Sequence, residues 1–139
     1  MKKTVAALRM DGSTATADFL DLLVRAWKMV NIKDKAAHIK LCDSSRKPFY
    51  HQSDSRLGFL RSLADSVTGM KGGKGASRHF SLTSDTRSSL AVTLNGLCHL
   101  IEEMLSRDHS YVLPGHIQSD RIEAEFGIYR LTMQNFIRL

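Results

Sequence analysis

Apolar residues recur at helical spacing in four stretches of the chain. Residues three and four positions apart share one face of an α-helix, so each stretch predicts an amphipathic helix. We expect helices over residues 14–31, 55–70, 84–109 and 122–136. The expected apolar faces are Phe19, Leu20, Leu23, Val24, Trp27 and Val30 in the first, Leu57, Leu60, Leu63, Ala64 and Val67 in the second, Leu90, Leu94, Leu97, Ile101, Met104 and Leu105 in the third, and Ile122, Phe126, Tyr129, Met133 and Phe136 in the fourth.

The connections between these helices carry turn and breaker residues. Pro48 excludes a continuous helix through residues 32–53, and Gly69 with the following "KGGKG" ends the second helix. Ser84 or Asp85 is expected to cap the third helix. Residues 110–115, "SYVLPG", predict at most a short strand that ends at Pro114. The predicted fold class is mainly α.

The aromatic residues of the first two helices allow two interpretations. Trp27, Phe19 and Phe59 could stack on nucleic-acid bases. They lie at helical spacing beside leucines, however, so we expect them in the hydrophobic core.

Composition narrows the class of partner and the location. The chain has 139 residues, a usual length for one domain, with a net charge of +6. A basic chain favours anionic partners such as nucleic acid or nucleotide phosphates. Cys42 and Cys98 form no CxxC pair, which favours a reducing nuclear or cytoplasmic location over secretion. The opening "MKKTVAALRM" is too short in apolar residues for a signal peptide, and no stretch approaches the ~18 apolar residues of a membrane span.

Two short motifs invite chemical readings. "GMKGGKGAS", residues 69–77, is rich in glycine and lysine but departs from a phosphate-binding loop, because Gly75 stands where that loop has Ser or Thr. We interpret it as a solvated basic linker that can touch phosphates. His38 and Cys42 are four residues apart, yet no second pair completes a zinc site.

The carboxylates near the end of the chain have two readings. Asp120 and Glu123 match the spacing of a helix capping box, with Glu125 nearby. Carboxylates also hold magnesium for phosphoryl transfer, although such a site needs two or three that converge. Composition and spacing do not choose between a helix cap and part of a catalytic site.

A family resemblance bears on this choice. The stretch "LPGHIQSDRIEAEFGIYR" resembles the closing motif of the P-element family of transposases, which includes the THAP-domain-linked relatives. That motif runs Gln-Asp, two residues, Glu, two residues, Phe-Gly and then Arg. The matching residues are Gln118, Asp120, Glu123, Phe126, Gly127 and Arg130, with Ser119 inserted. Upstream, "TADFLDLLVRAWKMVNIKD" and the stretch from "TSDTRSSLAV" to "GHIQSD" resemble family segments in the same order.

The resemblance implies a fold and a function. Residues 1–110 would correspond to a helical GTP-binding insertion domain, and residues 111–139 to a short returning C-terminal stub of the RNase H-like catalytic core. Glu123 would be the final catalytic metal ligand and Asp120 its neighbour in the motif, whereas Glu125 matches no catalytic position. The implied cofactors are GTP and Mg²⁺, and the implied partner is DNA. Lys71, Lys74 and Asp34 are candidates for holding GTP, on charge and loop position alone.

The chain also departs from the family. The two earlier catalytic aspartates have no counterpart here, and "LTMQNFIRL" does not resemble the usual Gly/Asn-rich tail. One carboxylate of three cannot assemble a two-metal site. We therefore expect a fragment, a truncated gene or a decayed copy that neither cuts nor joins DNA by itself. The alternative is a stand-alone basic helical interaction module that binds nucleic acid or an acidic partner.

Overall fold

The computed structural model describes residues 14–70, 82–117 and 123–128, with side chains from Thr16 onward. Its elements are the α-helices α2 (Thr14–Val30), α3 (Ala37–Lys40), α4 (Ser55–Gly69) and α5 (Ser84–Ser106), and the 3-10 helices η1 (Ser44–Arg46) and η2 (Pro114–His116). Residues 123–128 form a further helical segment. Helix accounts for 71% of the described residues and none of them lies in a strand, which confirms the mainly α prediction.

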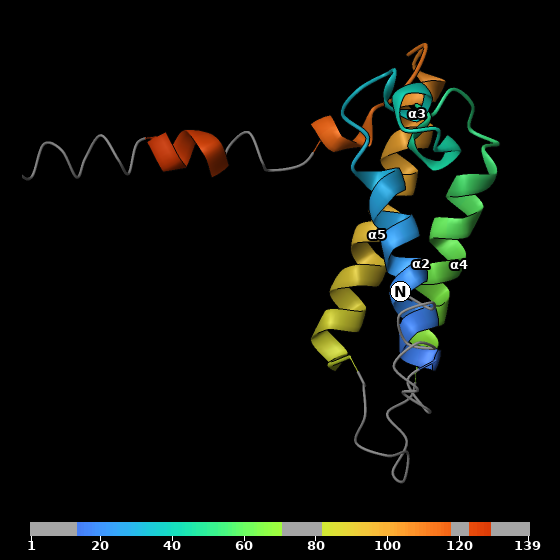
Figure 1. Ribbon diagram of the computed structural model, residues 1–139, viewed down its shortest axis with the longest axis vertical. Helices are drawn as coiled ribbons and strands as arrows, with labels where there is room; N and C mark the ends of the chain where they lie inside the picture. The colour runs from blue at the N-terminus through green and yellow to red at the C-terminus, as the bar shows by residue number, and fades with distance from the viewer. Residues whose placement is uncertain (1–13, 71–81, 118–122, 129–139) are drawn as a thin grey trace, which may run out of the picture.

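Helices α4 and α5 pack along each other, and α2 lies beside them (Figure 1). Helix α4 buries all five apolar residues that its spacing predicts, from Leu57 to Val67. Helix α5 buries Ala91, Leu94, Cys98 and Ile101 against them, and its remaining predicted apolar residues are partly buried. The helical periodicity of these two stretches therefore fixes the centre of the core.

The start of α5 differs from the prediction by one residue. Thr83 is the capping residue, and its side chain accepts a hydrogen bond from the backbone amide of Thr86 at 3.2 Å. Ser84 and Asp85 lie inside the helix, so the prediction that one of them caps it is wrong. Thr83 has the extended backbone that a cap needs, whereas Asp85 in the first turn favours the helix dipole instead.

The neighbouring helices cover only part of the apolar face of helix α2. It buries Ala26 and Met29, whereas Trp27 is 59% exposed and Val24 46% exposed. The expectation of a core position is therefore wrong for Trp27, although Phe19 and Phe59 do pack against the core. Trp27 follows Ala26 by one residue, about 100° around the helix, so it does not share the buried position of Ala26.

An apolar groove runs between α2 and α5. Its volume is about 310 Å³, and it is lined by Leu20, Leu23, Val24, Ala26, Trp27 and Val30 of α2, Leu63 of α4, and Leu90 and Leu94 of α5. We call it the α2–α5 groove. Leu63 lies in the core at 3% exposure and closes its floor.

The short strand predicted at residues 110–115 is absent. Phe49 and Val112 form one isolated antiparallel bridge, with amide-to-carbonyl distances of 3.1 and 2.8 Å. Both side chains are buried, so the bridge ties the loop before α4 to the segment after α5. Pro114 then begins η2 instead of continuing a ladder, since it has no amide to donate.

Gly115 fastens the segment after α5 to the end of α2. Its amide donates to the carbonyl of Ile32 at 3.0 Å. A Cβ atom at this position would lie 2.6 Å from Cγ of Lys33 and 2.9 Å from the Ile32 carbonyl oxygen, so only glycine fits without a shift. We call residues 43–56 together with residues 111–117 the loop end of the molecule.

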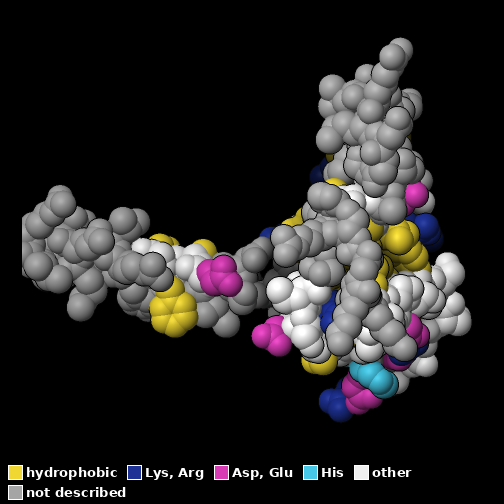
Figure 2. All heavy atoms as spheres, turned by 90° about the horizontal axis from the view of Figure 1, so that it is seen from below, with side chains coloured by type: hydrophobic (Ala, Val, Ile, Leu, Met, Phe, Trp, Pro, Cys, Tyr) yellow, Lys and Arg dark blue, Asp and Glu magenta, His cyan; other side chains and the backbone are white. Residues whose placement is uncertain are grey.

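Residues 123–128 extend away from the packed helices (Figure 1), and all six are exposed. A hydrophobic and an acidic side chain of this segment stand out to solvent in Figure 2. Phe126 is 59% exposed and Ile128 58% exposed. The predicted division of the chain between residues 110 and 111 stays a prediction, although the described packing continues through residue 117.

No helix in the described ranges is long and apolar enough to cross a membrane.

Candidate functional site

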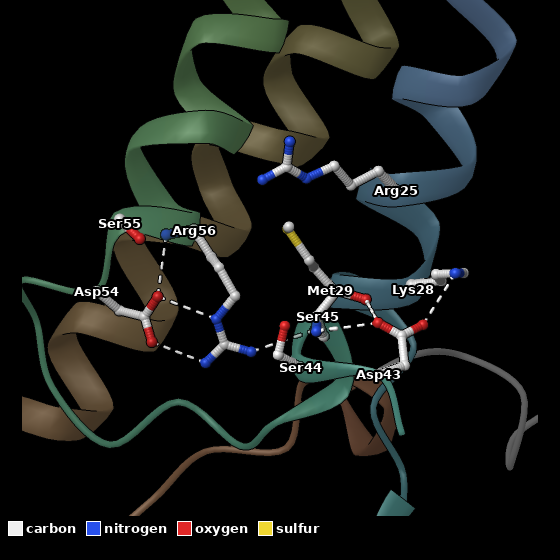
Figure 3. A pocket seen from close by; sticks show the side chains of 9 residues that line it. All are labelled: Arg25, Lys28, Met29, Asp43, Ser44, Ser45, Asp54, Ser55 and Arg56. Carbon is white, nitrogen blue, oxygen red and sulfur yellow. Dashed lines mark hydrogen bonds and ion pairs between the residues drawn. The ribbon is translucent and has the colours of Figure 1, made fainter. Parts of the chain in front are cut away.

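A polar cavity of about 650 Å³ opens between α2, η1 and the first turn of α4. Small-molecule sites usually have volumes of about 300–1,000 Å³. The lining residues are Arg25, Lys28 and Met29 of α2, Asp43, Ser44 and Ser45 at η1, and Asp54, Ser55 and Arg56 at the start of α4 (Figure 3). We call it the Arg25 cavity.

Arg56 is fully engaged by the protein. Its guanidinium donates to both carboxylate oxygens of Asp54, at 3.0 and 2.7 Å, and to the carbonyl of Pro48 at 3.0 Å. It also donates to the carbonyl oxygens of Ser45 and Lys47. The side chain is only 12% exposed and lies over the Phe49 ring at 4.1 Å. The Arg56 guanidinium therefore links the loop to α4, and its donors are used by the protein itself.

Asp54 completes this contact. Its carboxylate caps α4 by accepting the backbone amide of Arg56 at 2.9 Å. Burial opposes the charge of the carboxylate, yet the hydrogen bonds from Arg56 hold the pKa of Asp54 below its usual value. A ligand in the cavity would thus meet an Asp54 charge that Arg56 has already neutralised.

Asp43 and Lys28 form the second charge pair of the cavity. Asp43 accepts from the Ser45 hydroxyl at 2.5 Å and pairs with the Lys28 ammonium at 2.9 Å. These two contacts lower the pKa of Asp43 to about 2. The Lys28 side chain remains 37% exposed, so its ammonium can reach an anion while it stays close to Asp43.

Of the cations that line the cavity, Arg25 is the one without a carboxylate partner among the described residues. It extends from α2 toward α4, apart from both carboxylates (Figure 3). Its guanidinium lies 4.4 Å from the centre of the Phe59 ring. Such stacking orients the planar group and leaves its edge donors open, which suits recognition of a phosphate.

The lining of the cavity carries groups that can bind an anion. It offers a guanidinium with no carboxylate partner in the described part of the chain, a lysine and the hydroxyls of Ser44 and Ser55. Within residues 14–70, 82–117 and 123–128, no group of three or more histidine, cysteine, aspartate or glutamate side chains is placed to hold a metal. The arrangement fits an anion such as the phosphates of a nucleotide.

The structure places two of the five residues singled out from the sequence. Asp34 pairs with Lys40 at 2.8 Å and accepts the amide of Ala36 at 2.9 Å. These two hydrogen bonds hold the pKa of Asp34 below its usual value, and it does not line the Arg25 cavity. Glu123 is exposed at the first residue of the helical segment 123–128.

Lys71, Lys74 and Asp120 lie outside the described residues. Their predicted roles, nucleotide contact for the lysines and motif neighbour for Asp120, stay predictions. The same holds for the proposed capping box, because one of its two residues is Asp120.

The three cations that line the cavity were not among the candidate binding residues predicted from the sequence. Arg25 and Lys28 stand three apart on the polar side of α2, a spacing that alone indicates only a solvated helix face. Arg56 is brought to the loop end by the fold, and its acceptors span residues 45–54. One local feature of the sequence could have indicated the role of Arg56. A loop with Pro48 leads into Asp54, the residue that caps α4, and Arg56 follows at once.

Comparison with known protein families gave no match for this sequence. The curated proteins and the solved structures likewise gave no match.

Proposed function

We propose that this chain is part of a P-element-type DNA transposase, with a helical region that binds GTP and one acidic residue that returns to the catalytic core. The observation that carries the proposal is the arrangement around the "LPGHIQSDRIEAEFG" stretch. Its Pro114 and Gly115 are buried against the packed helices, and the described helical residues 123–128 lie away from them. A segment with exposed Phe126 and Ile128 suits a piece that completes another domain.

The Arg25 cavity is the proposed place for the nucleotide. Arg25 supplies a guanidinium without a carboxylate partner in the described ranges, and Lys28, which pairs with Asp43, supplies a second cation of the lining. Phosphates are held by such charge-assisted hydrogen bonds. This assignment replaces Asp34, whose carboxylate is bound by Lys40 and Ala36.

Glu123 is the proposed metal-binding carboxylate. It is exposed, so it can join carboxylates of a surrounding catalytic core. When bound there, Mg²⁺ would stabilise negative charge on the phosphate that reacts. One carboxylate is too few for this metal, so the chain by itself is not proposed to cut or join DNA.

Calorimetric titration with GTP, with ATP as the control nucleotide, tests the proposal. We expect selective GTP binding in magnesium at moderate salt. Arg25→Gln should weaken it roughly 10- to 150-fold, as expected for the loss of a charged hydrogen bond worth about 1.5–3 kcal/mol. The matched control is Arg107→Gln, since Arg107 is an exposed arginine that pairs with Glu103 on α5. It should leave GTP affinity within about twofold.

Two results would contradict the proposal. Equal, salt-sensitive binding of GTP and ATP would point to a basic interaction module without base recognition. A folded chain that binds neither nucleotide would remove the nucleotide-binding role.

A further inference from the structure

A second surface lies at the loop end, on the outer side of the Phe49–Val112 bridge. In paired extended segments, neighbouring residues point to opposite faces. Phe49 and Val112 point inward and are 0% and 2% exposed. Their neighbours Tyr50 and Tyr111 therefore share the other face, as the paired residues next to the bridge.

The two tyrosines form an aromatic pair at the surface. Their ring centres are 6.2 Å apart and the ring planes are tilted by 52°. Tyr111 is 37% exposed and Tyr50 is half-buried. The two backbone hydrogen bonds of the bridge hold the pair in place, so its position does not depend on a flexible loop.

Two lysines accompany the rings. The Lys35 ammonium lies 4.4 Å from the centre of the Tyr111 ring, and the Lys47 ammonium lies 5.6 Å from the centre of the Tyr50 ring. Neither lysine forms an ion pair with a carboxylate of the described residues. Asp34 is paired with Lys40, and Asp54, whose charge also attracts Lys47, is paired with Arg56.

The energies favour exchange of these contacts for a ligand. A nucleic-acid base stacked on an aromatic side chain is held more strongly than an exposed ammonium over the same ring. A base can therefore displace a lysine from its ring, and the displaced ammonium can then meet the neighbouring phosphate.

We propose that Tyr50 and Tyr111, with Lys35 and Lys47, form a binding surface for single-stranded nucleic acid. A base lies on the tyrosine pair, and the lysines contact the phosphates on either side. Single strands fit this surface better than duplex, because only an unstacked base exposes its face to a protein ring. The surface shares no residue with the Arg25 cavity, so the proposal does not rest on GTP binding.

Fluorescence anisotropy with a labelled oligothymidylate of about 16 nucleotides tests the proposal, with a duplex of equal length as comparison. The single strand should bind more tightly than the duplex. Tyr111→Ala should weaken single-strand binding roughly 5- to 150-fold, the equivalent of losing one stacked base. Tyr111→Phe keeps the ring and should stay within about twofold of the unaltered chain.

The lysines are tested by the salt dependence of binding. Lys35→Gln and Lys47→Gln should each make the plot of log affinity against log salt shallower by about 0.7, the value for one phosphate contact on a single strand. Lys40→Gln removes the same charge from a lysine that Asp34 already holds, so it is the matched control and should change the slope less.

The outcomes separate the possibilities. If Tyr111→Ala melts like the unaltered chain and binds the single strand equally well, the surface is not a stacking site and the proposal is overturned. If Tyr111→Ala does not fold, the lysine variants decide, and unchanged salt slopes for both overturn it. Loss of single-strand binding with unchanged GTP titration supports this surface independently of the nucleotide cavity.

Discussion

The loop end and the α2–α5 groove differ in how far their apolar side chains are covered. At the loop end, Phe49 is fully buried under hydrogen-bonded backbone and the Arg56 guanidinium. Along the groove, Trp27 and Val24 remain about half exposed between two helices. The difference shows that hydrogen bonds cover the apolar side chains of one region, whereas the apolar side chains of the other region stay partly exposed.

The largest expected effect is the loss of Arg56. Arg56→Ala should lower the free energy of unfolding by about 3 kcal/mol, because Asp54 and three backbone carbonyl groups, two of them part-buried, lose their donor together. Urea unfolding followed by circular dichroism measures this change. Arg61→Ala is the matched control, since Arg61 pairs with Glu102 at 2.5 Å, with no other ion pair among the described residues, and is 40% exposed. It should cost less than about 1 kcal/mol, and equal losses in both variants would mean that Arg56 does not organise the loop end.

A smaller effect concerns Asp43 and acid. Because Ser45 and Lys28 lower the pKa of Asp43 from 3.8 to about 2, its contribution to stability is complete above pH 4 and is lost as pH falls toward 2. Asp43→Asn keeps an acceptor for the Ser45 amide but loses the ion pair with Lys28, so it should cost about 1 kcal/mol or less at neutral pH. The free energy of unfolding of the Asp43→Asn variant should then fall less steeply between pH 4 and 2 than that of the unaltered chain. Parallel acid unfolding curves for the two chains would exclude this role.

The smallest expected effect is at the groove. Trp27→Gln should change the free energy of unfolding by less than about 0.5 kcal/mol, because most of the ring already contacts water. Chemical unfolding followed by circular dichroism measures it, with Leu60→Ala as the buried comparison at about 2–5 kcal/mol. A loss at Trp27 comparable to that at Leu60 would show that the groove is closed in solution.

The sequence predicted best where one helix face is buried completely. In α4, all five predicted positions from Leu57 to Val67 are buried, because α5 packs along that face. The same reasoning was wrong for Trp27, since apolar spacing shows which side of a helix is hydrophobic but not how much of that side a neighbour covers. The third helix was predicted within a few residues, and only its cap was misplaced.

The sites were less accessible to prediction than the helices. Contacts such as Arg56 to Pro48, or Tyr50 to Tyr111, join residues whose proximity depends on the completed fold. Asp34 was selected for its charge and loop position, but its carboxylate stabilises the turn into α3. Local charge therefore indicates where polar groups gather, and only the packed chain distinguishes a structural ion pair from an available cation such as Arg25.

The contact of Gly115 with Ile32 bears on where the chain can be truncated without losing contacts of the packed helices. A cut after residue 110 would remove Val112, leave both backbone groups of Phe49 without their partners and open the end of α2 to water. A cut after residue 117 keeps the bridge, η2 and the glycine contact with Ile32. A boundary after residue 117 therefore keeps the backbone contacts that hold the loop end together, whereas the predicted boundary after residue 110 would break them.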